Sequence, residues 1–254
     1  MTAPLRAMIL AAGRGERMRP LTDHCPKPLL QVGGRSLLEW HLLALARAKI
    51  RDVVINLSWK GSMIPQLVGD GARYALRITY SDEGDGALET AGGIVRALPL
   101  LGDAPFLVIN GDIWTDFDYA RPPQLDPQAL GSLIVVPNPP QHPHGDFALL
   151  PRGVSVPTGA SAGVSGGLFD ILADPERLAA PTAPPRFTFS GIAHYRREFF
   201  DGVAPGRQPL LPLLRRAAAA GRLRGRLYQG VWFDIGTPER LRELDERLAG
   251  GALG

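Results

Sequence analysis

Several features are scarce or missing in this sequence of 254 residues, and each absence excludes a class of protein. Cys25 is the only cysteine, so the chain cannot form an intramolecular disulfide, and a reducing compartment, the cytoplasm, is expected. No apolar run reaches the roughly 20 residues that a membrane-spanning helix requires, and no N-terminal signal peptide is expected. The basic residues form no long run interleaved with aromatic residues, so neither a membrane nor a nucleic acid is the expected partner.

Two common nucleotide-binding motifs are also missing. The Walker A string G-x-x-x-x-G-K-[ST] does not occur. The dinucleotide-binding string G-x-G-x-x-G is incomplete, because Met18 stands where the third glycine is required. Pro20 soon follows, and the apolar run at 53–57 ends without the acidic residue that binds the ribose of NAD. An NAD-dependent oxidoreductase is therefore disfavoured.

The chain has instead a stretch of small and basic residues directly after a short apolar strand expected at 7–10. Residues 11–28 read AAGRGERMRPLTDHCPKP. Gly13 and Gly15 allow a ligand to approach the backbone closely and can aim N–H groups into one concavity. Arg17 and Lys27 add positive charge. A strand that leads into a small, cationic loop indicates a phosphate-binding site, whereas the alternative is a basic surface loop with turn glycines.

Strands and helices alternate through the first 115 residues. Ser36 followed by Glu39 predicts a capping box at the start of a helix that extends to about residue 50, and His41 is expected to pack in the interior. The further strands and helices are expected at 53–57, 63–68, 76–81, 88–98 and 106–110. This alternation predicts an α/β protein with parallel strands and right-handed crossovers.

Four segments of this half are expected to converge where parallel strands end, which is where α/β sheets bind ligands. They are the basic loop, Asn56, the turn at 88–93 and the Asn-Gly-Asp sequence at 110–112. The glycines at the start of the helix after residue 88 are expected to leave N–H groups free for a ligand.

The second half of the chain is richer in proline and glycine, and no internal repeat is visible. Ser190 and Gly191 are small residues that would let a ligand approach the strand expected at 187–195. The other expected elements are strands at 133–137, 146–151, 222–230 and 232–236, a strand or a strand and short helix at 163–172, an exposed loop with one helical turn at 173–185, and helices at 210–221 and 238–250.

The basic loop resembles the signature of sugar-1-phosphate nucleotidyltransferases, A-G-x-G-x-R-x-x-P-L-T followed by P-K-P, at residues 12–22 and 26–28. The resemblance continues through Gly-Asp at 111–112 and W-x-D-I-G-T-P at 232–238. It implies a Rossmann-like, three-layer nucleotide-diphospho-sugar transferase fold with a mixed, mostly parallel central sheet. Residues 1–254 would form one domain, with a nucleotide-binding half at about 1–115, a sugar-binding half at about 116–254 and no C-terminal β-helix.

The resemblance also implies a reaction and a site. A nucleoside triphosphate would react with a sugar 1-phosphate to give a nucleotide sugar and pyrophosphate, with Mg²⁺ held by Asp112 and Asp234. Arg17 would hold the β- and γ-phosphates, and Lys27 would lie between the α-phosphate and the sugar phosphate, so these four residues are the expected catalytic set. The expected nucleotide-binding residues are Leu10, Ala11, Ala12, Gly13, Gly15, Glu16, Arg17, Lys27, Glu89, Thr90 and Asn110. The expected sugar-binding residues are Gly145, Asp146, Thr188, Ser190 and Gly191.

Three segments resemble one subgroup of the family, whose members transfer UMP from UTP to N-acetylmuramate 1-phosphate in bacterial cell-wall recycling. They are GERMRPLT at 15–22, LETAGGI at 88–94, and HPHGDFALL at 142–150 together with TFSGIAHY at 188–195. His144 and the alanine- and proline-rich loop before 188 depart from that pattern. Mannose-1-phosphate guanylyltransferase, glucose-1-phosphate thymidylyl- or uridylyltransferase and a non-catalytic nucleotide-sugar binder remain alternatives, and a monomer is slightly favoured.

Overall fold

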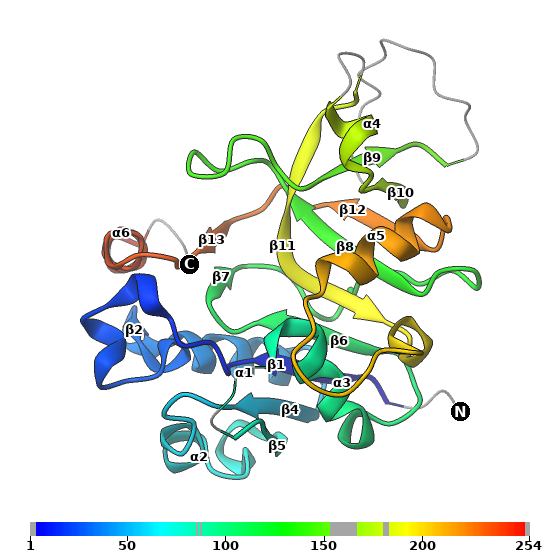
Figure 1. Cartoon of the computed structure of the whole chain (residues 1–254). Coiled ribbons are helices and arrows are strands. Elements are labelled where there is room, and N and C mark those ends of the chain that lie inside the picture. The colour runs from blue at the N-terminus through cyan, green and yellow to red at the C-terminus, as the bar shows by residue number, and fades with distance from the viewer. Residues whose placement is uncertain (1–3, 85, 87, 153–166, 180–182, 252–254) are drawn as a thin grey trace.

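The computed structural model describes residues 4–84, 86, 88–152, 167–179 and 183–251. The expected segments 163–172 and 173–185 therefore lie partly outside the described residues. A nine-stranded sheet with the order β5-β4-β1-β6-β11-β8-β12-β10-β9 forms the centre of the molecule (Figure 1). The first four strands of that order come from residues 1–115 and the other five from residues 116–254, so one sheet crosses both halves of the chain.

The helices and strands follow the expected order along the chain. The strands of the large sheet are β1 (Arg6–Leu10), β4 (Asp52–Leu57), β5 (Arg77–Asp82), β6 (Phe106–Asn110), β8 (Gly131–Val136), β9 (Phe147–Leu150), β10 (Phe169–Leu172), β11 (Arg186–Tyr195) and β12 (Leu223–Leu227). Two short pairs lie outside it, β2 (Gln31–Val32) with β3 (Arg35–Ser36) and β7 (Ile113–Thr115) with β13 (Trp232–Asp234). The helices are α1 (Leu37–Arg47), α2 (Met63–Val68), α3 (Glu89–Leu101), α4 (Pro175–Ala179), α5 (Leu211–Ala219) and α6 (Pro238–Ala249).

Strand direction confirms the predicted mixed, mostly parallel sheet. The strands β5, β4, β1 and β6 are parallel neighbours. The strand β11 pairs antiparallel with both β6 and β8, and β10 pairs antiparallel with both β12 and β9. Seven of the nine strands therefore point the same way, with β11 and β10 opposed.

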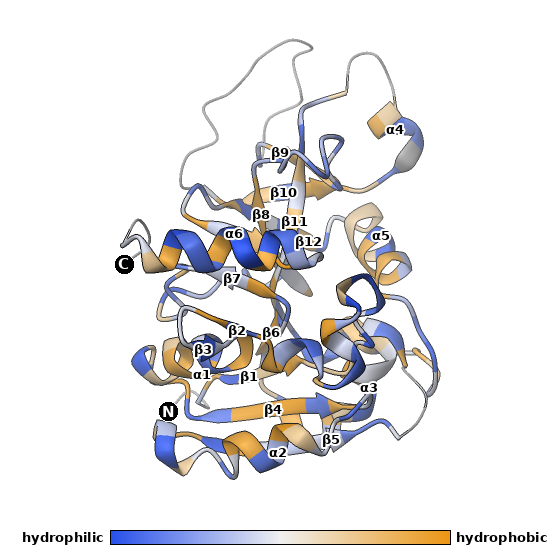
Figure 2. Ribbon diagram, turned by 90° about the vertical axis from the view of Figure 1, so that its left-hand side faces the viewer, coloured by the Kyte–Doolittle hydropathy of each residue, from blue (hydrophilic) through white to orange (hydrophobic). Residues whose placement is uncertain are grey.

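Apolar side chains alternate between the two faces of the parallel strands and bury both. On one face the residues of β1, β4 and β6 pack with α1 and α2, and on the other face they pack with α3 and α5, which gives three layers. Figure 2 shows β4 as mostly hydrophobic along its length, as expected for a strand covered on both faces. None of the helices in the described ranges combines the length and apolar character needed to cross a bilayer.

The helix α1 begins where the capping box predicts. The Ser36 hydroxyl accepts the Glu39 N–H at 3.2 Å, and the Glu39 carboxylate accepts the Ser36 N–H at 3.1 Å. His41 is buried, as expected, and its Nε2 lies 2.9 Å from the Ile113 carbonyl while its Nδ1 lies 3.2 Å from the Tyr119 hydroxyl. These partners assign the neutral tautomer with the proton on Nε2. Burial lowers the pKa of His41 to about 4.

The glycines of α3 serve packing, and the expectation of N–H groups left free for a ligand is wrong at two positions. The N–H groups of Ala91 and Gly92 both donate to the Gln208 carbonyl, at 3.0 and 3.2 Å. A Cβ at Gly92 would collide with the Gly206 carbonyl oxygen. A distant segment before α5 thus lies against this helix start, and the chain needs glycine there because backbone meets backbone.

Candidate active site

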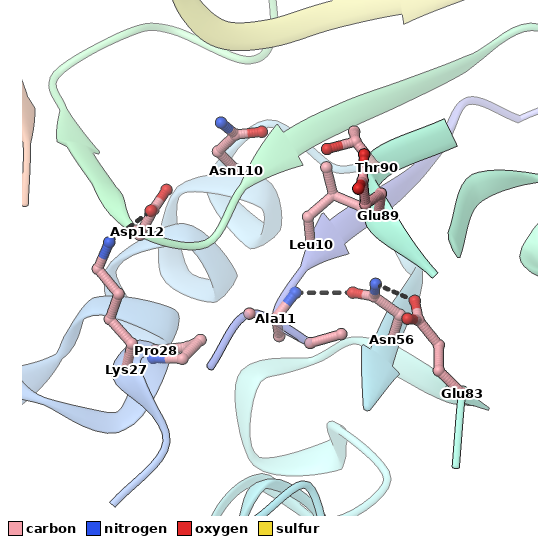
Figure 3. Close-up of a pocket in the computed structure, with 12 residues that line it drawn as sticks. Leu10, Ala11, Lys27, Pro28, Asn56, Glu83, Glu89, Thr90, Asn110 and Asp112 are labelled. Atoms are coloured by element: carbon pink, nitrogen blue, oxygen red, sulfur yellow. Dashed lines mark hydrogen bonds and ion pairs between the residues drawn. The ribbon is translucent and has the colours of Figure 1, made fainter. Parts of the chain in front are cut away.

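A cavity of about 210 Å³ opens at the carboxyl ends of β1, β4 and β6 (Figure 3). All four segments that were expected to converge contribute to it, which confirms the argument from parallel strand ends. Its lining residues are Leu10, Ala11, Ala12, Gly13, Lys27, Pro28, Asn56, Glu83, Glu89, Thr90, Asn110 and Asp112.

A buried hydrogen-bonded chain fixes the base of this cavity. The Ala11 N–H donates to Asn56 Oδ1 at 2.7 Å, and Asn56 Nδ2 donates to Glu83 Oε1 at 2.6 Å. The second oxygen of Glu83 accepts the Leu88 N–H at 3.0 Å. The chain joins the ends of β1, β4 and β5 to the start of α3, and Gly93 leaves the space that the Glu83 carboxylate occupies. Buried polar groups that are satisfied in this way rigidify a site.

Lys27 is a buried cation that points at a carboxylate from the next strand end. Its side chain is 9% exposed, and Nζ lies 2.5 Å from Asp112 Oδ2. Pro26 and Pro28 flank it and restrict the backbone of the short helical turn that carries it. A lysine is buried only when its charge is compensated, so the position of Lys27 depends on Asp112.

Pairing of β7 with β13 brings the two predicted metal carboxylates together. Asp234 stands opposite Ile113 in the antiparallel register, and the Ile235 N–H donates to the Asp112 carbonyl at 3.0 Å. Asp112 and Asp234 are therefore neighbours in space although 122 residues separate them in sequence. Arg240 from the first turn of α6 donates to Asp234 Oδ2 at 2.6 Å.

A second cavity, of about 380 Å³, adjoins the first and shares Asn110 and Asp112 with it. Its wall includes both carboxylates, three cationic or titratable side chains and the middle of β11. The lining residues are Arg17, Asn110, Asp112, Ile113, Pro139, Gln141, His142, Thr188, Phe189, Ser190, Trp232, Asp234 and Arg240. A ligand that spans both cavities would pass Asn110 and Asp112 at the end of β6.

The strand β11 approaches β6 closely at this junction. Gly191 has φ +82°, and a Cβ there would lie 2.7 Å from Asn110 Cγ, so only glycine fits without displacing that side chain. The ladder with β8 shifts register at the same place. The Ser190 hydroxyl donates to the Ile134 carbonyl at 2.8 Å, and the Trp232 indole N–H donates to the Ser190 carbonyl at 2.9 Å.

Asp146 supports the far wall of the second cavity. One carboxylate oxygen accepts the Phe189 N–H at 2.8 Å, and the other lies 3.0 Å from His142 Nε2. Thr188 beside it donates to Asn138 Oδ1 at 2.9 Å. The carboxylate thus holds His142 against β11.

The sequence-predicted residues fall into three groups. Leu10, Ala11, Ala12, Gly13, Lys27, Glu89, Thr90, Asn110 and Asp112 line the first cavity, and Arg17, Asn110, Asp112, Thr188, Ser190 and Asp234 line the second. Gly15, Glu16, Gly145, Asp146 and Gly191 line neither, and the last two act through the neighbours described above. The lining residues for which the sequence predicted no place in the site include Glu83, Gln141, His142 and Arg240. The binding role of each predicted residue remains a prediction.

Comparison with known proteins agrees with this arrangement. The family described as nucleotidyl transferase matches residues 6–139. The N-acetylmuramate alpha-1-phosphate uridylyltransferase of Neisseria meningitidis is 45% identical over 97% of this chain and 99% of its own length. The protein of that name from Caulobacter vibrioides is 32% identical over 97% of this chain and 98% of its own.

The fold itself recurs in a solved structure from Bacillus anthracis that is named for a glucose-1-phosphate thymidylyltransferase. The TM-score is 0.73 at 18% identity, over 96% of this chain and 95% of that one. The fold is that of an α/β protein whose two adjoining cavities meet at the end of β6. The chain belongs to the nucleotidyl transferase family.

Proposed function

We propose that this protein transfers UMP from UTP to N-acetylmuramate 1-phosphate, giving UDP-N-acetylmuramate and pyrophosphate. The observation that carries the proposal is the full-length similarity to two proteins named for this activity, one of them 45% identical. The two adjoining cavities support it, because a nucleotide and a sugar phosphate must meet at one point for the transfer.

The donors at the junction suit Mg²⁺. Asp112, just before β7, and Asp234, at the end of the paired strand β13, supply hard carboxylate oxygens, and both line the second cavity. The described residues hold no cluster of three or more acidic, histidine or cysteine side chains that could enclose a metal. Mg²⁺ suits such an incomplete set, since it commonly takes its other ligands from substrate phosphates and water. Bound there, it would neutralise phosphate charge during the transfer.

The protein's own residues would perform the remaining work by alignment and charge. The sugar phosphate oxygen attacks the α-phosphorus of UTP, and the bond to the β-phosphate oxygen breaks, which releases pyrophosphate. Lys27, held in place between two prolines, would stabilise charge on the α-phosphate and the incoming phosphate. Arg17, which reaches the second cavity from the basic loop, would bind the leaving phosphates.

The metabolic setting is part of the same proposal. N-acetylmuramate is a constituent of peptidoglycan, and nucleoside triphosphates are available in the cytoplasm. We therefore place the reaction in the cytoplasm, in the recycling of cell-wall sugars.

Pyrophosphate release tests the proposal directly. The assay crosses UTP, GTP, dTTP and CTP with the 1-phosphates of N-acetylmuramate, N-acetylglucosamine, glucose and mannose in the presence of Mg²⁺. Turnover confined to UTP with N-acetylmuramate 1-phosphate is expected. Preference for GTP with mannose 1-phosphate would instead assign these two compounds as the substrates. Nucleotide binding without any turnover would indicate a non-catalytic binder.

Removal of the metal and of one carboxylate tests the site. A chelator should abolish turnover, and added Mg²⁺ should restore it. Asp112→Asn should lower kcat by orders of magnitude while the protein stays folded, because charge at the transferring phosphate dominates this chemistry. A chelator-resistant enzyme, or a near-normal rate for Asp112→Asn, would contradict the assigned roles.

A further inference from the structure

A third cavity, of about 530 Å³, shares no lining residue with the two described above. Pro105, at its edge, directly precedes β6, whereas Asn110 and Asp112 lie at the other end of that strand. We call it the arginine cavity. Its lining residues are Pro105, Ala120, Arg121, Pro122, Pro123, Gln124, Leu125, His194, Arg196 and Arg226.

The arginine cavity is lined by cationic side chains and by no acidic one. The side chain of Arg226 is half-buried and makes no ion pair or hydrogen bond to any other residue that the structure describes. Arg196 donates from Nε to the Ala129 carbonyl at 2.9 Å and from Nη2 to the Asp126 carbonyl at 3.4 Å, and it forms no ion pair with any described residue. Arg121 at the rim is exposed and lies 3.6 Å from Asp118. Partly buried guanidinium groups without counter-ions favour an anionic ligand.

His194 adds an acceptor to these donors. Its Nδ1 donates to the Pro123 carbonyl at 2.8 Å, while Nε2 is buried and has no partner among the described residues. Burial, together with the charge of Arg196, lowers the pKa of His194, so the ring is neutral and Nε2 carries a lone pair. Ser132, opposite His194 in the ladder with β8, also has a buried hydroxyl without a partner. Buried polar atoms of this kind are normally satisfied by a ligand or water.

We propose that the arginine cavity binds a small phosphorylated molecule, separately from the nucleotidyl transfer site. The guanidinium groups of Arg196 and Arg226 bind the phosphate, for which their planar donor geometry is suited. The Nε2 atom of His194 accepts a hydroxyl hydrogen, from hydrogen phosphate or from the sugar that carries the phosphate. The volume lies in the range of roughly 300–1,000 Å³ that is usual for small-ligand sites.

Calorimetric titration with inorganic phosphate, in the absence of Mg²⁺, tests the proposal. The proteins compared are the wild type, Arg17→Ala, Arg226→Gln and the control Arg222→Gln. Arg222 is an exposed arginine just before β12 that does not line the cavity. Arg226→Gln should weaken phosphate binding about tenfold or more, because charge-assisted hydrogen bonds are lost. Arg17→Ala and Arg222→Gln should retain the wild-type affinity, and Arg226→Gln should retain thermal stability and nucleotidyl transfer.

The results that overturn the proposal are equally specific. They are wild-type affinity in Arg226→Gln, loss of binding in Arg17→Ala alone, or no phosphate binding to any protein. If Arg226→Gln fails to fold, His194→Gln replaces it in the titration. Weakened phosphate binding is again expected, and unchanged binding would rule out the site. Competition in the Arg17→Ala protein by UMP or by N-acetylglucosamine 6-phosphate shows which organic group can carry the phosphate that the cavity binds. Displacement of inorganic phosphate by either compound supports the site.

Discussion

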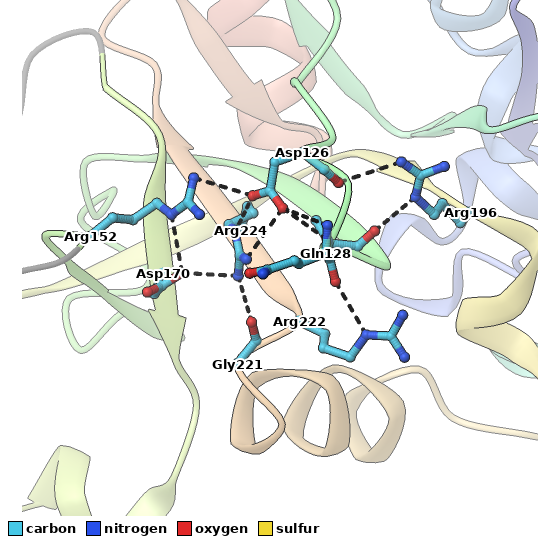
Figure 4. Close-up of polar contacts among 9 residues, drawn as sticks. Asp126, Gln128, Arg152, Asp170, Arg196, Gly221, Arg222 and Arg224 are labelled. Atoms are coloured by element: carbon cyan, nitrogen blue, oxygen red, sulfur yellow. Dashed lines mark hydrogen bonds and ion pairs between the residues drawn. The ribbon is translucent and has the colours of Figure 1, made fainter.

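Removal of the buried cation Arg224 should destabilise the part of the sheet that residues 116–254 form. Its side chain is 2% exposed, and it pairs with Asp126 at 2.6 Å and with Asp170 at 2.9 Å (Figure 4). Asp126 is itself only 17% exposed. Although burial raises the pKa of Asp126, hydrogen bonds from Arg224 and Gln128 and the charges of Arg224 and Arg152 hold it below its usual value. Arg224 and Asp126 are therefore both charged, and each compensates the buried charge of the other.

The magnitude follows from what remains after Arg224→Met. Breaking a buried pair costs about 3–5 kcal/mol, because one charge is left uncompensated. Asp126 would keep the N–H groups of Gln128 and Ala129, at 2.9 and 3.1 Å, and the exposed Arg152 at 3.3 Å. Because these donors remain, the expected loss in the free energy of unfolding lies at the lower end of that range, about 3 kcal/mol. For a chain of this size that corresponds to a decrease in Tm of roughly 6–12 °C.

Urea unfolding and calorimetry measure this loss, and Arg226→Met, two residues along the same strand, is the matched control. That control should change stability by less than about 0.5 kcal/mol, since it breaks no ion pair among the described residues. The double variant Arg224→Met with Asp126→Asn should recover about 1–2 kcal/mol, because the amide accepts the same N–H groups without a charge. A loss below about 1 kcal/mol, or no recovery in the double variant, would refute the reasoning.

Three further outcomes are expected. Lys27→Ala should lower kcat by orders of magnitude in the pyrophosphate-release assay, while circular dichroism stays unchanged; a wild-type rate would contradict its role. Gly93→Ala should destabilise by about 1–3 kcal/mol in urea unfolding, because its Cβ would collide with a Glu83 oxygen, whereas Gly86→Ala, with open space around it, should be neutral. The folded-state pKa of His41, about 4, lies below the unfolded value, so its contribution to stability is complete above about pH 6.5 and is lost as the pH falls. Urea unfolding should show wild type losing about 3 kcal/mol more than His41→Gln between pH 7.5 and pH 4, and parallel profiles would contradict this.

The first half of the fold could be predicted because its signals are local. The reciprocal bonds of Ser36 and Glu39 involve residues three positions apart, so the start of α1 can be read from the sequence. The same holds for the alternation of strands and helices around it. The meeting of the loop, Asn56 and the 110–112 segment then follows from parallel strand order, which is a general property of such sheets.

The contacts that fix the site could not be predicted in this way. Asn56 and Glu83 lie 27 residues apart and each looks like an ordinary polar residue at a strand end. The segment at 206–208 packs against the start of α3, although more than 100 residues separate the two in sequence. No local sequence pattern predicts this contact. Arg224 lies in RLRGRLY, a pattern typical of an exposed strand, yet it is buried because two acidic residues from other segments reach it. The family resemblance placed Asp234 near Asp112, whereas spacing alone did not.

The change of strand direction at β6 explains why the two cavities share their boundary. Because β11 runs antiparallel to β6, its middle and not its end lies beside Asn110, and a residue there must have no side chain. Gly191 meets that requirement, and the adjacent carbonyl of Ser190 accepts the indole N–H of Trp232, which fixes β13 next to β11. The carboxylate of Asp234 on β13 is thereby held beside the same strand end that carries Asp112. The walls of both cavities are therefore built on paired strands, and such support limits the freedom of the side chains that line them.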